Sequence, residues 1–286
     1  MRVVQRNRGA RTYFYLQYSF RKDGHVVTRE KYLGLHIPEN MEIIKEEVLK
    51  EMKRHVYSDL ENIKARFQQE WQGLPETVKE NQKHEIAIAF TYNTNAIEGS
   101  IITLKDAREI IAEGIAPAKP LRDIKETESH ASVFLRMLGE NNDIDEQLLI
   151  KWHKDLFLPT KPDIAGIFRN YLIRVGSYVA PDWQDVKELM RELIRFIRMS
   201  SGNPVEHAAR VHYRFEKIHP FGDGNGRLGR LLMNCMLWRA GYPMLIIEYR
   251  KRRAYYAALE KDEEGFVKYF MRMYLKAFKK LTGKAQ

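Results

Sequence analysis

The segment 218–230 concentrates residue types that could carry out chemistry on a nucleotide. It reads Ile-His-Pro-Phe-Gly-Asp-Gly-Asn-Gly-Arg-Leu-Gly-Arg. His219 is a base whose ordinary pKa lies near neutral pH, and Asp223 offers the hard carboxylate oxygens that magnesium binds. Arg227 and Arg230 lie three residues apart, so on a helix both would project from one face toward a polyphosphate. The spacing therefore indicates group transfer from a nucleotide.

The glycines of this segment predict a loop that binds anions. Residues 208–218 before the loop and residues 228–240 after it both have the pattern of helices. Gly224 and Gly226 can adopt backbone angles that turn several N–H groups toward one point, and the dipole of the following helix adds to that positive field. We therefore expect a phosphate site at the N-terminus of this helix.

Other sites were weighed for the same segment. In an EF-hand, Arg227 would occupy an oxygen-ligand position and Asn234 would replace the bidentate glutamate. The phosphate loop of nucleotide triphosphatases requires Gly-Lys-Ser/Thr, which is missing here. A zinc site built from His212 and His219 would separate the two residues by about 10 Å along a helix, so His212 is interpreted as a packing residue. The glycines alone are also consistent with a loop that only connects two helices.

From His219 to Arg230 the chain resembles the motif of Fic-domain proteins, His-x-Phe-x-Asp/Glu-Gly-Asn-Gly-Arg-x-x-Arg, at every position. Residues 231–234, 239–243 and 255–256 also resemble the family, and the similarity extends back to about Tyr92. Related Doc kinases have lysine where this chain has Gly226, so the resemblance implies transfer of AMP in place of a phosphoryl group. It also implies a mainly α fold, a Fic-type helical bundle with a β-hairpin flap.

The resemblance implies a reaction and a role for each motif residue. His219 would take the proton of a Ser, Thr or Tyr hydroxyl on a target protein, and that oxygen would attack the α-phosphorus of ATP. Pyrophosphate would leave, and Asp223 would hold Mg²⁺. Catalytic roles are implied for His219, Asn225 and Arg227. The residues implied to bind the nucleotide are Gly222, Asp223, Gly224, Asn225, Gly226, Arg227, Arg230 and Tyr256.

A second motif predicts an inhibitory element. Residues 94–99, Thr-Asn-Ala-Ile-Glu-Gly, end a helical stretch, and alone they are typical of a helix corner with a solvated glutamate. They also resemble the inhibitory helix of Fic proteins, Ser/Thr-x-x-x-Glu-Gly/Asn. The resemblance implies that Glu98, at the end of a helix over about 85–98, pairs with Arg230 where the γ-phosphate would otherwise bind. A departure from a close relative at Glu263 leaves the adenine contacts open.

The residues before 76 predict an appendage and a connector. Alternating apolar residues from Arg11 to Leu35 predict two strands joined by a turn at Asp23-Gly24. A helical stripe follows from Met41 to about Arg66. We therefore predict a small β-hairpin appendage over residues 1–38, a helical connector over 39–75 and a Fic catalytic domain over 76–286.

Further elements are expected to support the motif. Apolar stripes at helical spacing predict core helices at residues 127–138, 145–157, 186–199, 253–260 and 266–278. The β-branched residues between 166 and 181 predict a hairpin. The resemblance implies that this hairpin is the flap, which pairs with the target polypeptide through main-chain hydrogen bonds.

The formal net charge of +10 is concentrated at the two ends of the chain. Residues 1–36 hold eight Lys/Arg against two acids, and residues 250–286 hold eleven against four. Basic ends could bind nucleic acid, although solvated basic residues are the commoner reason for such a charge. The single cysteine, Cys235, lies in an apolar stretch and predicts a core position in a reducing, cytoplasmic setting. No apolar run has membrane-spanning length, so no membrane partner is expected, and a homodimer stays open.

Two alternative functions stay open. The same site could remove AMP from a modified protein, with Glu98 positioning a water molecule. A non-catalytic module could instead bind nucleic acid through the basic termini.

Overall fold

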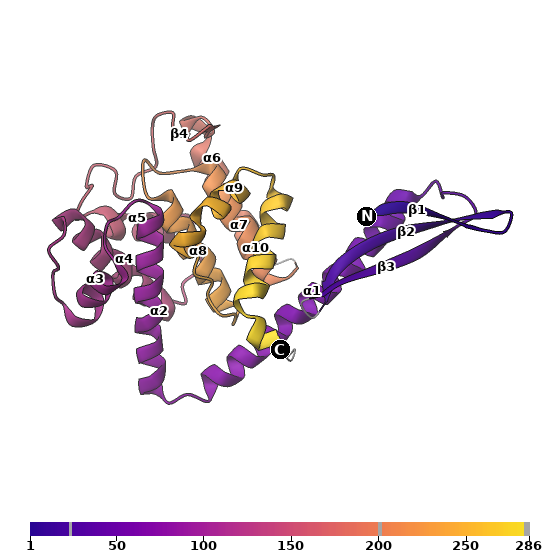
Figure 1. Ribbon diagram of the computed structural model, residues 1–286. Coiled ribbons are helices and arrows are strands. Elements are labelled where there is room, and N and C mark those ends of the chain that lie inside the picture. Colours follow the sequence, from indigo (N-terminus) through magenta and orange to yellow (C-terminus); the bar gives the residue numbers. More distant parts are fainter. Residues whose placement is uncertain (23–24, 200–201, 283–286) are drawn as a thin grey trace. The chain divides into compact units, whose positions relative to one another are not determined.

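The computed structural model describes residues 1–22, 25–199 and 202–282 (Figure 1). The chain divides into two compact units, one containing residues 1–63 and the residues from Phe278 onward, the other residues 64–277. The division falls within helix α1 (Met41–Gln72). The domain limits at residues 38 and 75 stay predictions.

The first unit contains a three-stranded antiparallel sheet in the order β1-β2-β3. Strands β2 (Arg11–Lys22) and β3 (His25–Gly34) are the two strands predicted from the sequence. Strand β1 (Arg2–Arg8) was missed, because its arginines and polar residues give little alternation of apolar and polar side chains. The predicted turn residues Asp23 and Gly24 lie outside the described residues.

Only one face of this sheet contributes to the core of the first unit. Leu16 and Tyr18 of β2 and Val48 of α1 are buried together, with Leu33 and Ile44 packed around them. Side chains alternate between the two faces of a strand, so the neighbouring β2 residues point away from α1. Helix α1 therefore covers the face of the sheet that carries Leu16 and Tyr18.

The second unit is helical, with one small hairpin (Figure 1). Its α-helices are α2 (Glu76–Ile97), α3 (Leu104–Arg108), α4 (Leu121–Gly139), α5 (Glu146–Phe157), α6 (Val186–Arg198), α7 (Pro204–Ile218), α8 (Asn225–Arg239), α9 (Arg252–Leu259) and α10 (Glu263–Ala277). Strands β4 (Arg174–Val175) and β5 (Tyr178–Val179) form the hairpin. The predicted mainly α fold with a hairpin flap is confirmed.

Helix α8 lies at the centre of the second unit. It is buried on nearly all sides: Leu228, Leu231, Leu232 and Cys235 are fully buried, and so are its polar residues Arg230 and Asn234. Helices α2, α4, α5 and α7 pack around α8, so it has no broad face left for solvent. Burial raises the pKa of the Cys235 thiol to about 12, as expected for a core cysteine.

The end of α1 packs against the helical unit. The rings of Phe67 and Trp71 contact the ring of Trp238, with centroid distances of 6.1 and 5.2 Å. Gln68 Nε2 donates a hydrogen bond of 2.9 Å to the carbonyl of Gly241. These contacts explain why residues from 64 onward belong to the second unit. Over the described ranges, no helix has both the length and the apolar character needed to cross a bilayer.

Candidate active site

The loop between α7 and α8 has a strained and cross-braced backbone. Helix α7 ends at His219, whose φ of 51° makes it the one non-glycine residue with positive φ in the described part of the chain. The Asn225 side chain closes the loop, because its Nδ2 donates to the Phe221 carbonyl at 2.8 Å and its Oδ1 accepts from the Phe221 N–H at 2.9 Å. Strain of about 1–3 kcal/mol is expected for such a backbone, and residues of this kind cluster at functional sites.

Gly224 begins helix α8 in the left-handed conformation, with φ of 78°. A Cβ atom at this position would lie 2.2 Å from the ring of Phe157, so only glycine fits. The predicted loop between two helices, opening at a helix N-terminus, is therefore present. Its free N–H groups and the helix dipole provide a site for an anion.

His219 has the hydrogen-bonding pattern of a general base. Its Nδ1 lies 3.3 Å from the Glu216 carbonyl, which can only accept, so Nδ1 carries the proton and Nε2 keeps its lone pair. Burial lowers the pKa of His219, and the charge of Arg169 lowers it further. The imidazole is therefore neutral at pH 7, as proton abstraction requires.

Arg169 ties the loop to the segment before the hairpin. It is buried, and its Nε donates to the His219 carbonyl at 2.8 Å. Its two other nitrogens bond the carbonyls of Tyr171 and Pro181, at 2.8 and 2.7 Å. Sequence reasoning placed Arg169 in the flap and gave it no role. The structure shows that Arg169 holds the backbone at His219, the candidate catalytic base.

His153 of α5 packs against the loop, and sequence reasoning gave it no role. Its ring stacks on Phe221, with centroids 3.8 Å apart and planes 6° from parallel. Its Nδ1 accepts from the Gly166 N–H at 2.9 Å, so Nε2 carries the proton and donates to the Asp223 carbonyl at 3.0 Å. Burial lowers the pKa of His153 to about 4, so this imidazole is neutral at pH 7. On an amphipathic helix a single histidine gives no sequence signal of this role.

Arg227 is held by a buried carboxylate, Glu126 of α4. Arg227 Nη1 forms a short ion pair with Glu126 Oε2, and both side chains are less than 10% exposed. Glu126 Oε1 also lies 3.0 Å from Lys161 Nζ and accepts from Thr160 at 3.2 Å. Burial raises the pKa of Glu126, but the positive charges of Arg227 and Lys161 outweigh this effect and lower the pKa to about 2. Glu126 was missed because it lies on an otherwise ordinary helix, 101 residues from its partner.

We expect Glu126→Gln to destabilise the protein by about 3 kcal/mol, because it removes the close counterion of the buried Arg227 and leaves the half-exposed Asp223 at 3.8 Å. The free energy of unfolding, measured with urea, is the readout. The matched control is Glu188→Gln, which removes the same charge from exposed pairs with Arg191 and Arg195. The control should leave the midpoint unchanged. Equal effects of the two substitutions would contradict the role given to Glu126.

Arg230 and Glu98 form the pair that the resemblance implied. Arg230 Nη2 lies 2.6 Å from Glu98 Oε1, and Arg230 Nε donates to Thr94 Oγ1 at 2.7 Å. Arg230 is 1% exposed, and Glu98 caps the C-terminus of α2. Burial lowers the pKa of Arg230, but the negative charge of Glu98 outweighs this effect and keeps the pKa above its usual value. A Cβ on Gly226 would lie 2.3 Å from Glu98 Oε1, so glycine is needed for this approach.

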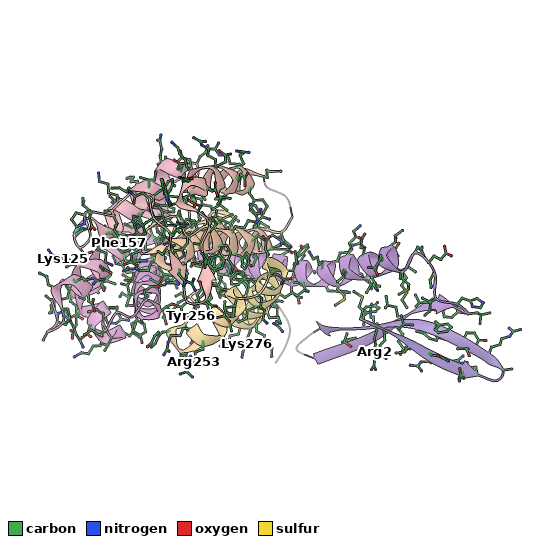
Figure 2. All side chains as sticks on the ribbon, turned by 90° about the horizontal axis from the view of Figure 1, so that it is seen from above. Arg2, Lys125, Phe157, Arg253, Tyr256 and Lys276 are labelled. Carbon is green, nitrogen blue, oxygen red and sulfur yellow. The ribbon has the colours of Figure 1, made fainter. Side chains whose placement is uncertain are left out.

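Glu216 and Tyr256 complete the surroundings of Arg230. Burial raises the pKa of Glu216 to about 7, and the charge of Arg230 opposes this shift. The Tyr256 hydroxyl donates to the Ile97 carbonyl at 3.2 Å, which places it beside Glu98, and its ring is partly exposed (Figure 2). His212 is fully buried and lies 2.8 Å from the Tyr255 hydroxyl, in agreement with its interpretation as a packing residue.

Asp223 is the residue that could hold a metal. Over the described residues, no three His, Cys, Asp or Glu side chains are grouped as a metal site. Magnesium at phosphates usually takes one or two protein carboxylates and fills its other positions with phosphate and water oxygens, and a single half-exposed Asp223 fits that donor set. Asp223 Oδ2 lies 2.6 Å from Lys161 Nζ. Burial raises the pKa of Asp223, but the hydrogen bond from Lys161 outweighs this effect and keeps the pKa below its usual value.

Two further predicted features are located by the structure. The hairpin pairs Arg174 with Val179 and Val175 with Tyr178, so its strands are shorter than the predicted segment. Glu263 bonds Arg210 at 2.8 Å and Arg214 at 2.9 Å. The residue that departs from the family pattern therefore links α10 to α7.

Comparisons with known proteins agree with the motif. Residues 143–237 match the Fic/DOC family. "Protein adenylyltransferase Fic" from Drosophila ananassae is 34% identical over 202 residues, which cover 66% of this chain and 40% of that protein. The chain thus spans about 40% of the length of such curated relatives.

Solved structures share the fold. Fic-1 from C. elegans superposes with a TM-score of 0.69 at 25% identity, covering 87% of this chain and 78% of that one. A Fic domain containing signaling protein from Bacteroides thetaiotaomicron gives a TM-score of 0.67 at 23% identity, covering 78% of this chain and 98% of that one.

Proposed function

The chain belongs to the Fic/DOC family, and from that premise we propose that it transfers AMP from ATP to a Ser, Thr or Tyr hydroxyl of a target protein. The observation that carries the proposal is the complete motif from His219 to Arg230, folded as a braced loop at the N-terminus of α8. The loop thus joins a base with a free lone pair, at the end of α7, to an anion site and two buried arginines in the first turns of α8. Group transfer from a nucleotide needs these parts.

In the proposed reaction, Nε2 of His219 takes the proton of the target hydroxyl. The hydroxyl oxygen forms a bond to the α-phosphorus as the bond from that phosphorus to the bridging oxygen of the β-phosphate breaks. Pyrophosphate leaves and AMP stays on the target. The loop N–H groups, with Asn225 fixing their direction, stabilise the charge on the α-phosphate, and Arg227 and Arg230 bind the β- and γ-phosphates.

Asp223 would hold Mg²⁺ in this proposal, and the ion would supply positive charge against the phosphates. In the structure Lys161 pairs with the same Asp223 oxygen, so a cation already neutralises this carboxylate. Lys161 also contacts Glu126, which gives it a second partner when Asp223 takes a metal.

We further propose that Glu98 inhibits the transfer. Its carboxylate bonds Arg230 Nη2, the nitrogen that a γ-phosphate would otherwise use, and it fills the space beside Gly226. Two anions cannot share this position, so ATP would bind with its terminal phosphate displaced. The α-phosphorus would then lie out of line for attack.

We expect Arg227→Lys, in a Glu98→Gly background, to weaken ATP binding about 10-fold. Lysine keeps the charge beside Glu126 but loses the planar fork that bonds two phosphate oxygens. Isothermal titration with ATP and Mg²⁺ measures the change. Arg239→Lys is the matched control, because Arg239 lies at the far end of the same helix and bonds the carbonyls of Glu140 and Asn142. Unchanged affinity and turnover in Arg227→Lys would show that this arginine does not bind the nucleotide.

A second candidate function is removal of AMP from a modified protein in the same site. The position of Glu98 favours it, because this carboxylate pairs with Arg230 while its charge also acts on His219 and partly opposes the lowering of its pKa. The Glu98 carboxylate could then orient a water molecule toward a bound phosphate. Metal-dependent release of AMP that is lost in Glu98→Gly would identify this reaction.

Incubation with ATP and a cell lysate tests the proposed function. With ATP labelled at the α-phosphate, a lysate protein should gain label on a hydroxyl side chain, located by mass spectrometry, while pyrophosphate is released. Label that appears only in free AMP would contradict transfer.

A further inference from the structure

The sheet of the first unit has a second face that the proposed reaction does not use. Its residues, here called the basic sheet face, lie opposite to the face of Leu16 and Tyr18 and include Arg2, Arg6, Arg8, Arg11, Tyr15 and Tyr32. Arg2 is labelled in Figure 2. Cross-strand contacts show that they share one face. Arg2 Nε donates to Gln17 Oε1 at 2.8 Å, and Arg6 lies over the Tyr15 ring at 5.8 Å. The ring of Tyr32 is 5.3 Å from that of Tyr15 and is 54% exposed.

The arginines of this face are not balanced by acids. Arg8 lies directly opposite Arg11 in the register of β1 and β2, an arrangement that destabilises a sheet. Within the part of the chain that the structure describes, no carboxylate lies within 4 Å of Arg2, Arg8 or Arg11. The one described acid of this face, Glu30, is paired with Arg6 at 2.6 Å. The stability of the sheet does not explain why three arginines without an acidic partner lie on one small face.

The acids of the same unit lie on the opposite side. Residues 37–63 hold seven acids against four Lys/Arg, whereas residues 1–36 are basic. Glu47 and Glu51 of α1 pair with Lys31 and Arg29, whose side chains leave the sheet toward the helix. The unit is therefore polarised, with free positive charge on the face away from α1. A polyanion is the partner that such a face attracts.

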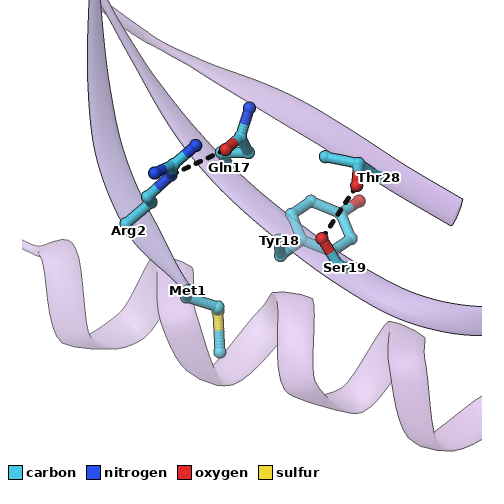
Figure 3. A pocket seen from close by; sticks show the side chains of 6 residues that line it. All are labelled: Met1, Arg2, Gln17, Tyr18, Ser19 and Thr28. Carbon is cyan, nitrogen blue, oxygen red and sulfur yellow. Dashed lines mark hydrogen bonds between the residues drawn. The ribbon is translucent and has the colours of Figure 1, made fainter. Parts of the chain in front are cut away.

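The polar groups next to Arg2 suit contacts with base edges. A hollow at this end of the sheet is lined by Met1, Arg2, Gln17, Tyr18, Ser19 and Thr28, with the Ser19 and Thr28 hydroxyls 2.9 Å apart (Figure 3). Amide and hydroxyl groups of this kind hydrogen-bond to bases, while arginine bonds phosphates and guanine. Three strands at about 4.8 Å spacing measure roughly 10 Å across, within the ~12 Å width of the DNA major groove.

We propose that the basic sheet face binds double-stranded DNA, with Arg2, Arg8 and Arg11 on phosphates and the hollow turned toward base edges. Sheets are established readers of DNA grooves. The deep, narrow major groove of an RNA duplex does not admit side chains on such a face, so duplex DNA is the better match. This role is independent of the proposed AMP transfer.

The test is fluorescence anisotropy of a labelled ~20-bp DNA duplex with the full chain, between about 50 and 200 mM NaCl. The test variant is Arg2→Gln with Arg8→Gln and Arg11→Gln. The matched control removes three positive charges whose partners are acids of the α1 side, by Arg29→Gln, Lys31→Gln and Lys45→Gln. The proposal expects binding by the wild type and the control. The test variant should lose at least ~10-fold in affinity, and its salt slope should fall by about 2–3.

A single substitution separates binding from folding. Arg11→Glu places an acid opposite Arg8, which should stabilise the sheet, yet it should weaken DNA binding about as much as the triple substitution. The proposal is overturned if the wild type does not bind the duplex at 50 mM NaCl, or if test and control variants lose equal affinity. It is also overturned if single-stranded RNA binds more tightly than the duplex, or if Arg11→Glu binds as the wild type does.

Discussion

Glu98→Gly should raise AMP labelling of protein targets about 100-fold. The substitution removes the carboxylate that lies 2.6 Å from Arg230 Nη2, so the guanidinium becomes available to the γ-phosphate. ATP can then bind with its α-phosphorus in line, and a misplacement of about 1 Å at the reacting atom can cost ~100-fold in rate. Initial rates of labelling in saturating ATP and Mg²⁺ measure the gain.

Two variants control this result. Glu85→Gly makes the same substitution on the same helix, at an exposed glutamate paired with Arg108, and it should leave labelling unchanged. The double variant Glu98→Gly with Arg230→Ala should lose the gain, because the activation works through the freed arginine. If Glu98→Gly labels no faster than the wild type, Glu98 is only a helix-corner residue.

His219→Ala, made in the Glu98→Gly background, should lower transfer at least ~100-fold while ATP binding persists. The imidazole acts on the target hydroxyl, so its loss removes proton transfer and leaves the phosphate site intact. Labelling rates and ATP titrations are measured side by side. Transfer at an unchanged rate would contradict the assignment of His219 as the base.

The pH dependence of the same rate gives an independent check on His219. Burial lowers the pKa of this imidazole below its usual value, and only the neutral form can accept a proton. The rate should therefore be level at neutral pH and should fall as the pH drops through a value below 6.5. A rate that increases as the pH falls from 7 to 6 would mean that the protonated form is the active one.

The sequence predicted the local parts of the site because their causes are local. The glycines around Asn225 favour a tight turn, and the apolar stripes on both sides predict the helices that hold it. The pairing of Glu98 with Arg230 had a different basis. These residues are 132 positions apart, and only the resemblance to a family brought them together.

The residues that sequence reasoning missed act through tertiary contacts. Glu126 and His153 lie on amphipathic helices, where a single acid or histidine looks like an ordinary surface or core residue. Their roles arise because α4 and α5 pack beside the start of α8, which places Glu126 on Arg227 and His153 under Phe221. Strand β1 was missed for a related reason, since its arginines face away from the core and give no apolar signal.

Parallel reactions of the Glu98→Gly protein with α-labelled and γ-labelled ATP test the central claim most directly. Both use the same target mixture, with His219→Ala in the same background as the blank. The account predicts that protein gains label from the α-phosphate and none from the γ-phosphate, and that the blank gains neither. Label from the γ-phosphate, or α-label that persists without His219, would contradict AMP transfer by this site.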